Sequence, residues 1–305
     1  MNFDVIIIGG SFAGLSTALY LARSRRRVLV IDAGEPRNRF AAASHSFLGQ
    51  DGVPPGQILS TAREQLRAYP EVTFWVDLAT RARHEADGFI VETWGGQRAT
   101  GKFLVLTTGV RDELPDIPGL AERWGKSVAH CPFCHGYEFG GAPLGVLATG
   151  SNSIHQAHII PQWGPTTFFT NGAITLSDEE RASLESRSVV IETEAVAALE
   201  GAGEALEHVR LTSGRVVPVR ALFLAPKLQM TSPLPEQLGC ELTDTMVGRL
   251  LSVGPDQQTT VPGVYAAGDV AAPTHNVAFA VADGAKVAGA INFKLFAIPE
   301  FKRPA

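Results

Sequence analysis

The chain has 305 residues, a formal net charge of −5, 45% hydrophobic residues and 19% charged residues. This composition is that of an ordinary folded protein, and the acidic balance argues against a general nucleic-acid binder, which needs a basic surface. The length favours two domains over one. No apolar run reaches the roughly 18 residues that a membrane helix needs, so we expect no membrane partner.

The first four residues lead directly into an apolar run, without a charged leader or a cleavage site. A signal peptide does not begin in this way, and we therefore expect a cytoplasmic protein. The three cysteines cannot build a disulfide framework. In a reducing compartment, a close cysteine pair is typically catalytic or metal-binding.

The N-terminal region predicts a strand, a tight turn, a helix and a second strand. Residues 5–8 are an uninterrupted apolar run, as expected for a strand that is buried on both faces of a parallel sheet. A glycine-containing turn follows at residues 9–14, then a helix over residues 15–22 and a strand over residues 28–31. A βαβ unit of this size is the setting of the dinucleotide-binding fingerprint.

The turn at residues 9–14 carries most of that fingerprint. Gly9 and Gly14 hold its first and third glycine positions, and Ser11 replaces the second. A small serine still lets the backbone approach a pyrophosphate at the helix N-terminus. Asp32 ends the second strand, where a carboxylate can accept hydrogen bonds from ribose hydroxyls. We predict a nucleotide site here, and the alternative is a glycine-rich turn without a ligand.

The rest of the chain predicts a second, similar domain. A second strand, turn and helix start at residues 144–150, and the next strand covers residues 166–170. A short strand runs into glycine and aspartate at residues 261–269, and a helix covers residues 277–296. Residues 114–119 and 243–245 have the composition of domain crossings. We therefore predict an α/β fold of two Rossmann-like domains, the second inserted into the first.

The segment Cys131-Pro-Phe-Cys134 has the spacing of a redox pair. In such motifs a thiolate can be stabilised by a helix start or by its neighbours, and Pro132 favours the first turn of a helix. His135 follows directly and can move a proton during thiol exchange. These three residues, Cys131, Cys134 and His135, are the predicted catalytic residues.

Three other interpretations of this segment remain open. Residues 131–135 match the attachment pattern of c-type haem, which needs export and a haem-sized fold. His130, Cys131, Cys134 and His135 could bind zinc, although structural zinc sites usually use two separated ligand pairs. The cysteines could also be packed and inert, as we expect for Cys240, which has no partner nearby in the sequence.

Together, residues 9–14, 107–109, 131–134 and 264–269 resemble the low-molecular-weight thioredoxin reductase family over nearly the whole chain. The resemblance implies an FAD-binding domain made of residues 1–115 and 246–305. It also implies a pyridine-nucleotide-type domain, residues 116–245, that carries the cysteine pair. A homodimer is expected from the family.

The resemblance also implies roles for individual residues. Gly9, Ser11, Phe12 and Ala13 would face the pyrophosphate of FAD, and Asp32 the adenosine ribose. Thr108 and Gly109 would line the nucleotide, Asp269 would bind the ribityl chain, and the helix starting at Val277 would point at the flavin. The other implied cofactor-binding residues are Gly14, Ala33, Gly34, Arg37, Asn38, His45, Ala79, Gly268 and Asn276. Cys134 would face the flavin, and Cys131 would meet the substrate.

The departures from the family pattern concern NADPH. Ordinary members carry aspartate after the second cysteine, where this chain has His135. The second turn, residues 148–155, has one glycine, and no arginine lies between residues 144 and 180 to hold a 2′-phosphate. A dianionic phosphate needs such a cation, so NADPH binding in the usual mode is doubtful.

Residues 32–38, His45 and residues 131–138 are similar to a branch in which the NADPH site has decayed. That branch includes dithiol oxidases that close disulfides in gliotoxin- and holomycin-type natural products. Other relatives take electrons from ferredoxin or from a second flavin bound in the NADPH-type site.

We therefore predict an FAD-dependent dithiol/disulfide oxidoreductase that relays two electrons between its substrate and FAD through Cys131 and Cys134. Its partner would be a small-molecule dithiol or disulfide, or a thioredoxin-like protein. One alternative is an NADPH-dependent thioredoxin reductase. The alternative from another class is a redox-sensing protein that holds flavin without turnover.

Overall fold

The computed structural model describes residues 1–297, which form two compact units. The first unit contains residues 1–39 and 56–111 and the chain from Gln229 onward, and the second contains residues 40–55 and 112–228. No helix in the described part of the chain is long and apolar enough to span a membrane.

The first unit is built on a seven-stranded sheet with the strand order β3-β2-β1-β6-β5-β4, and β19 pairs with β6. Its strands are β1 (Asn2–Ile8), β2 (Val28–Asp32), β3 (Val72–Val76), β4 (Ala79–Glu85), β5 (Gly88–Thr93), β6 (Arg98–Leu106) and β19 (Val264–Ala266). The strands β3, β2, β1, β6 and β19 are parallel, whereas β4 and β5 form an antiparallel edge. Residues 5–7 are fully buried, as their apolar run predicts.

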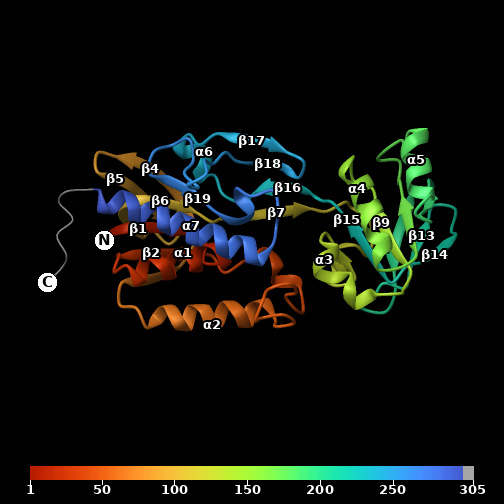
Figure 1. The fold of residues 1–305 in the computed structure, drawn as a ribbon, viewed down its shortest axis with the longest axis horizontal. Helices are drawn as coiled ribbons and strands as arrows, with labels where there is room; N and C mark the ends of the chain where they lie inside the picture. The colour runs from red at the N-terminus through yellow and green to blue at the C-terminus, as the bar shows by residue number, and fades with distance from the viewer. Residues whose placement is uncertain (298–305) are drawn as a thin grey trace. The chain divides into compact units, whose positions relative to one another are not determined.

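Two helices of this unit, α1 (Phe12–Arg23) and α7 (Val277–Phe296), pack against each other (Figure 1). Their close approach depends on Gly284, where a Cβ would lie 2.2 Å from the carbonyl oxygen of Ala13. Two hydroxyls of α1 also form hydrogen bonds to α7: Ser16 donates to the carbonyl of Val281, and Thr17 donates to that of Gly284. The unit also contains α2 (Pro55–Arg67), α6 (Leu234–Leu238), the 3₁₀ turn η5 (Gly268–Val270) and the hairpin β17 (Leu242–Thr245) and β18 (Gly248–Leu251).

The second unit has a five-stranded parallel sheet with the order β11-β10-β9-β15-β8. Its strands are β8 (Val128–Ala129), β9 (Leu144–Leu147), β10 (Thr166–Phe169), β11 (Val190–Glu192) and β15 (Ala221–Leu224). A three-stranded antiparallel sheet adds β12 (Val196–Glu200), β13 (His208–Leu211) and β14 (Val216–Pro218). The helices are α3 (Pro132–His135), α4 (Asn152–Ile159) and α5 (Asp178–Glu185).

Four further 3₁₀ turns complete the described elements: η1 (Arg37–Phe40), η2 (Ala121–Arg123), η3 (Tyr137–Phe139) and η4 (Ile160–Gln162). Where the chain leaves the first unit it forms β7 (Val110–Glu113), and where it returns it forms β16 (Lys227–Met230). These two strands pair with each other.

The predicted α/β fold with two Rossmann-like units is confirmed, whereas two domain boundaries differ from the prediction. The return to the first unit lies at residue 229, not near 245, because the polar residues 243–245 belong to the exposed strand of the β17–β18 hairpin. Residues 40–55, predicted as part of the FAD-binding domain, group with the second unit. Their contacts with the cysteine segment, described below, explain this grouping.

Candidate cofactor and redox site

The turn between β1 and α1 has room only for glycine at its two predicted positions. Gly9 has a φ of +105°, and a Cβ there would lie 2.2 Å from the carbonyl oxygen of Thr107. A Cβ on Gly14 would lie 1.9 Å from the carbonyl oxygen of Gly9. Ser11 is the N-cap of α1, and its side chain makes no capping hydrogen bond. The turn therefore leaves a helix N-terminus of the kind that binds phosphate groups.

Asp32 lies against this turn. A Cβ on Gly10 would come within 2.9 Å of the Asp32 carboxyl group, so the carboxylate and the turn are in van der Waals contact. Arg63 of α2 joins them, because its Nη2 donates to Asp32 Oδ2 (2.8 Å) and to the Gly10 carbonyl (2.9 Å). Sequence reasoning missed Arg63, since no motif links it to the turn.

Residues 107–109 close the other side of the turn. Thr107 Oγ1 lies within hydrogen-bond distance of the carbonyl oxygens of Ile8 and Gly9, at 2.9 and 2.8 Å. The hydroxyl of Thr108 is buried and has no hydrogen-bond partner within the described chain. Gly109 has a φ of +67° and open space around its Cα. An orphaned hydroxyl beside a phosphate-type turn fits a bound dinucleotide.

A third group of predicted residues meets at the loop between β19 and α7. Arg37 Nη1 donates to Asp269 Oδ2 at 2.8 Å and lies 2.8 Å from His275 Nδ1. Gly268, with a φ of +74°, packs against Ala13, and the Asn276 side chain caps α7 by accepting from Ala278 N–H. The structure thus brings together residues separated by more than 200 positions. His275 is a further residue that sequence reasoning missed.

The remaining predicted cofactor residues are distributed as follows. Ala33 and Gly34 follow β2, Asn38 lies in η1, Ala79 begins β4, and Val277 begins α7 as predicted. His45 is the exception, because it belongs to the second unit. The glycine turn, the Thr108 hydroxyl and the Arg37–Asp269 pair fit FAD as the bound cofactor. The FAD-binding roles of the individual residues stay predictions.

The cysteine segment forms the short helix α3, with Cys131 as its N-cap and Pro132 in its first turn, as predicted. Gly136 follows, and a Cβ there would lie 2.8 Å from the Trp163 ring, so glycine is needed for this packing. Phe133 meets the same ring edge to face, with centroids 5.5 Å apart. Gln156 of α4 donates to the carbonyl of His130 and fixes the approach to the helix.

The two thiols interact directly. The hydrogen bond to Cys131 raises the pKa of the Cys134 thiol, and burial, the negative charge of Cys131 and the Glu138 carboxylate raise it further. Cys134 therefore keeps its proton in this arrangement. The lowered pKa that the motif allows for one thiol does not apply to Cys134.

His135 is placed beside this pair. Burial lowers its pKa, whereas the backbone of Cys131 and the Glu138 carboxylate raise it, and His45 lowers it. The Nδ1 atom of His135 is buried without a hydrogen-bond partner in the described structure. An imidazole in this setting is poised to be neutral and to take up a proton when negative charge is near.

Residues 40–55 pack onto this redox segment. His45 Nε2 lies 3.4 Å from Glu138 Oε1, and His45 Nδ1 lies 3.6 Å from Asp51 Oδ1. The Ser46 hydroxyl donates to the carbonyl of Phe133 at 3.4 Å. These contacts put His45 next to the cysteine helix within the second unit, while its predicted contact with the cofactor stays untested. Within residues 1–297, no group of three or more His, Cys, Asp or Glu side chains could hold a metal ion.

In the second glycine turn, at the end of β9, Thr149 is held by hydrogen bonds within the second unit. The backbone N–H of Thr149 donates to Ser153 Oγ (3.0 Å), and the Thr149 hydroxyl donates to the carbonyl of Ala225 (2.5 Å). After β10, Asn171 takes a φ of 49° and its side chain accepts from the Val196 N–H. The amide and the hydroxyl of Thr149 therefore already have protein partners and are not available to a phosphate.

The charges near the end of β11 are also unfavourable to a phosphate. Glu192 ends this strand, opposite Phe169 of β10, and Glu194 follows two residues later. Arg215, from the loop between β13 and β14, lies 2.5 Å from Glu192 and 3.4 Å from Glu194. Arg215 lies outside residues 144–180, the stretch without arginine, and the two carboxylates neutralise its charge.

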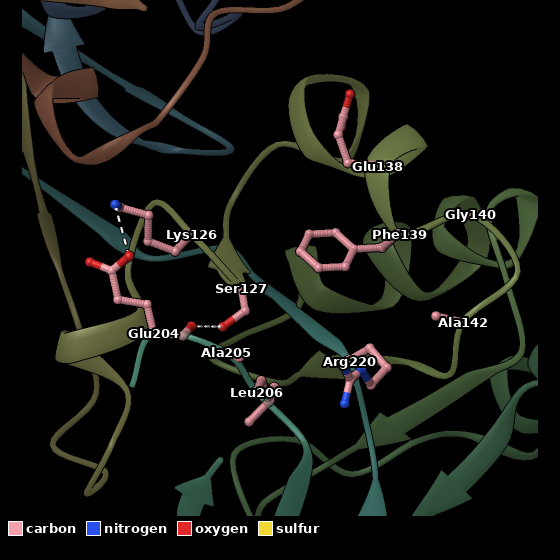
Figure 2. Close-up of a pocket in the computed structure, with 10 residues that line it drawn as sticks. All are labelled: Lys126, Ser127, Glu138, Phe139, Gly140, Ala142, Glu204, Ala205, Leu206 and Arg220. Carbon is pink, nitrogen blue, oxygen red and sulfur yellow. Dashed lines mark hydrogen bonds and ion pairs between the residues drawn. The ribbon is translucent and has the colours of Figure 1, made fainter. Parts of the chain in front are cut away.

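A cavity of about 480 Å³ lies elsewhere in the second unit (Figure 2). In it Lys126 pairs with Glu204 at 3.1 Å, and the Ser127 hydroxyl donates to the backbone carbonyl of Glu204. The lining residues are Lys126, Ser127, Glu138, Phe139, Gly140, Ala142, Glu204, Ala205, Leu206 and Arg220. None is a cysteine, so this cavity is not the redox centre.

Comparisons with known proteins identify the family of this chain. The model of the pyridine nucleotide-disulphide oxidoreductase family matches residues 3–161 and 165–287. The chain is 36% identical over 296 residues to thioredoxin reductase tcpT of Claviceps purpurea (strain 20.1), covering 92% of this chain and 90% of that protein. It is 29% identical over 310 residues to thioredoxin reductase sirT of Leptosphaeria maculans, covering 96% and 94%.

Two solved structures are also similar. The oxidoreductase from Agrobacterium tumefaciens has 46% identity and a TM-score of 0.93, covering 98% of this chain and 100% of that chain. The crystal structure of HlmI has 36% identity and a TM-score of 0.90, covering 97% and 93%. The fold and the two turns define a two-domain nucleotide-binding oxidoreductase. The chain belongs to the pyridine nucleotide-disulphide oxidoreductase family, within its thioredoxin reductase-like type, and its cofactor is FAD.

Proposed function

We propose that this enzyme is an FAD-dependent dithiol/disulfide oxidoreductase that works through Cys131 and Cys134 without the usual NADPH site. The observation that carries the proposal is the contrast between its two nucleotide turns. The first turn, at Gly9 and Gly14, is as tight as the dinucleotide fingerprint requires and leaves the N-terminus of α1 without a side-chain cap. In the second turn the Thr149 amide is bonded to Ser153, residues 144–180 contain no arginine, and Arg215 is held by two carboxylates.

The reaction is a two-electron relay. A substrate thiolate attacks Cys131 of the oxidised pair, which forms a mixed disulfide and releases Cys134 as a thiolate. A second substrate thiolate breaks the mixed disulfide, so that the substrate leaves as a disulfide and both cysteines are reduced. FAD, when bound, supplies the acceptor for the two electrons that the cysteines give up as their disulfide closes again.

The protein manages protons during this relay. When Cys134 is released as a thiolate, Cys131 is bonded to the substrate, and burial and the Glu138 carboxylate still raise the pKa of Cys134. His135 follows Cys134 directly, and once this neutral imidazole has taken up a proton from an entering substrate thiol, it can donate that proton to the thiolate. Cys131, which lies at the N-cap of α3, is suited to exchange with the substrate.

Anaerobic reduction of the purified holoenzyme tests the proposal. Dithiothreitol is expected to bleach the flavin, because it can enter the thiol relay directly. NADPH in large excess is expected to leave the flavin oxidised, because residues 144–180 contain no arginine to hold its 2′-phosphate. The measurement is flavin absorbance after rapid mixing. Fast bleaching by NADPH would favour the alternative, an NADPH-dependent thioredoxin reductase.

The same experiment addresses the alternative of a flavin-holding redox sensor. A sensor would be reduced once and would show no sustained turnover when dithiol and dioxygen are both supplied. Continuous oxidation of the dithiol, measured through the consumption of dioxygen, would identify an enzyme.

The pH dependence of turnover should reveal Glu138. Its carboxylate raises the pKa of both His135 and Cys134, so Glu138→Gln should lower both pKa values. We therefore expect the His135-dependent limb of the kcat/KM profile to move to lower pH, and His135→Gln to lack that limb. Glu204→Gln, which removes an exposed partner of Lys126, is the matched control. A limb that stays in place or moves upward in Glu138→Gln would contradict this assignment.

A further inference from the structure

Arg63 reaches from α2 into the cofactor turn, although it belongs to neither the turn nor the strand beside it. Its Nη2 atom bridges the Gly10 carbonyl at 2.9 Å and Asp32 Oδ2 at 2.8 Å. Both contacts are charge-assisted on the donor side, and the arginine and aspartate side chains are 31% and 21% exposed. The bridge joins the backbone entering the turn to the carboxylate that ends β2.

This bridge acts on one of the two carboxylate oxygens. Asp32 Oδ2 accepts from Arg63, whereas Oδ1 accepts no hydrogen bond from residues of the described chain. An aspartate at this place in the fold accepts hydrogen bonds from ribose hydroxyls. Arg63 thus fixes the carboxylate with one oxygen occupied and the other available.

The bridge also reduces the electrostatic repulsion between Asp32 and a diphosphate bound at the turn. The turn at residues 9–14 has the form of a pyrophosphate site, and the Asp32 carboxylate is in contact with Gly10 of that turn. An unpaired carboxylate there would repel a diphosphate. A guanidinium held against both groups neutralises the carboxylate and places a positive charge beside the turn.

We propose that Arg63 is a positioning residue for the adenosine half of FAD. It orients Asp32 for the ribose and offsets the negative charge of Asp32 beside the pyrophosphate turn. The inference rests on the FAD cofactor and not on the proposed dithiol reaction, so each can fail without the other.

The test is a titration of the full-length apoprotein with FAD and, separately, with ADP, which carries only the adenosine diphosphate half. Arg63→Ala should raise the Kd of both ligands by about 10- to 100-fold, the range expected for the loss of a charge-assisted contact. Arg63→Lys should restore part of the affinity. Arg67→Ala is the matched control, because Arg67 lies one turn further along α2 and pairs only with exposed Glu64.

A double-mutant cycle with Asp32→Asn separates positioning from a structural tie. If Arg63 acts through Asp32, then Arg63→Ala should weaken ADP binding much less in the Asp32→Asn background than in the wild type. Unchanged ADP affinity in Arg63→Ala, or losses that simply add in the double variant, would overturn the proposal. Thermal unfolding of each variant shows whether Arg63→Ala disturbs the packing of α2. If it does, Arg63→Lys is the deciding variant. An Arg63→Lys protein with wild-type stability but without any recovery of ADP affinity would also overturn the proposal.

Discussion

Replacing Cys131 with serine is expected to abolish dithiol turnover, with a loss of about 1,000-fold or more, because serine cannot form the mixed disulfide. The FAD content should stay unchanged, since Cys131 belongs to the second unit and the cofactor turn to the first. The measurements are steady-state oxidation of a dithiol and flavin absorbance per chain. Turnover of Cys131→Ser at the wild-type rate would contradict the relay through Cys131 and Cys134.

The companion variant Cys134→Ser distinguishes the roles of the two thiols. It should lose turnover as well, yet with a disulfide substrate it should hold that substrate on Cys131, which mass spectrometry detects as an adduct. The matched control is Cys240→Ser. Cys240 lies in the first unit with its sulfur 3.7 Å from Thr259 Oγ1, so its replacement should leave turnover unaltered. A trapped adduct on Cys134 in Cys131→Ser, with none on Cys131 in Cys134→Ser, would reverse the roles.

The second large effect is expected from Gly14→Ala, which should yield protein with little or no bound FAD. The added Cβ would lie 1.9 Å from the carbonyl oxygen of Gly9 and 2.8 Å from Thr107 Oγ1, so the turn must move. Overpacking of this kind typically costs about 1–3 kcal/mol of stability. The checks are the flavin-to-protein ratio after purification and the free energy of unfolding.

Gly289→Ala is the control for this change. Gly289 lies on an exposed part of α7, and nothing lies within 4 Å of its ideal Cβ position. Because alanine is a better helix former, this variant should gain up to about 1 kcal/mol of stability and keep its flavin. Full flavin retention by Gly14→Ala would show that the turn tolerates a side chain, against its geometry.

The local elements of this protein could be predicted because each depends on residues close together in the sequence. The apolar run at residues 5–8 and the glycine spacing after it specify a buried strand and a tight turn, and both are found. The helix from Val277 to Phe296 and the start of α3 at Pro132 also follow from local pattern and proline chemistry. The motifs therefore identified the fold class and the cysteine pair.

The domain boundaries could not be predicted in the same way. Residues 243–245 are polar like a linker, yet they pair with residues 248–250 in a hairpin. Residues 40–55 follow the first strands directly, yet His45 and Ser46 contact Glu138 and Phe133. Such contacts depend on distant partners, and composition does not report them.

The order of the residues specifies where the chain turns tightly, which cysteines are spaced for exchange and which stretch lacks arginine. Which charges meet depends on the folded chain: Arg63 with Asp32, Arg37 with Asp269, and Arg215 with Glu192. Turns and helix starts follow from the backbone preferences of neighbouring residues. An ion pair requires two side chains that the folded sheet brings together from 31, 232 and 23 positions apart.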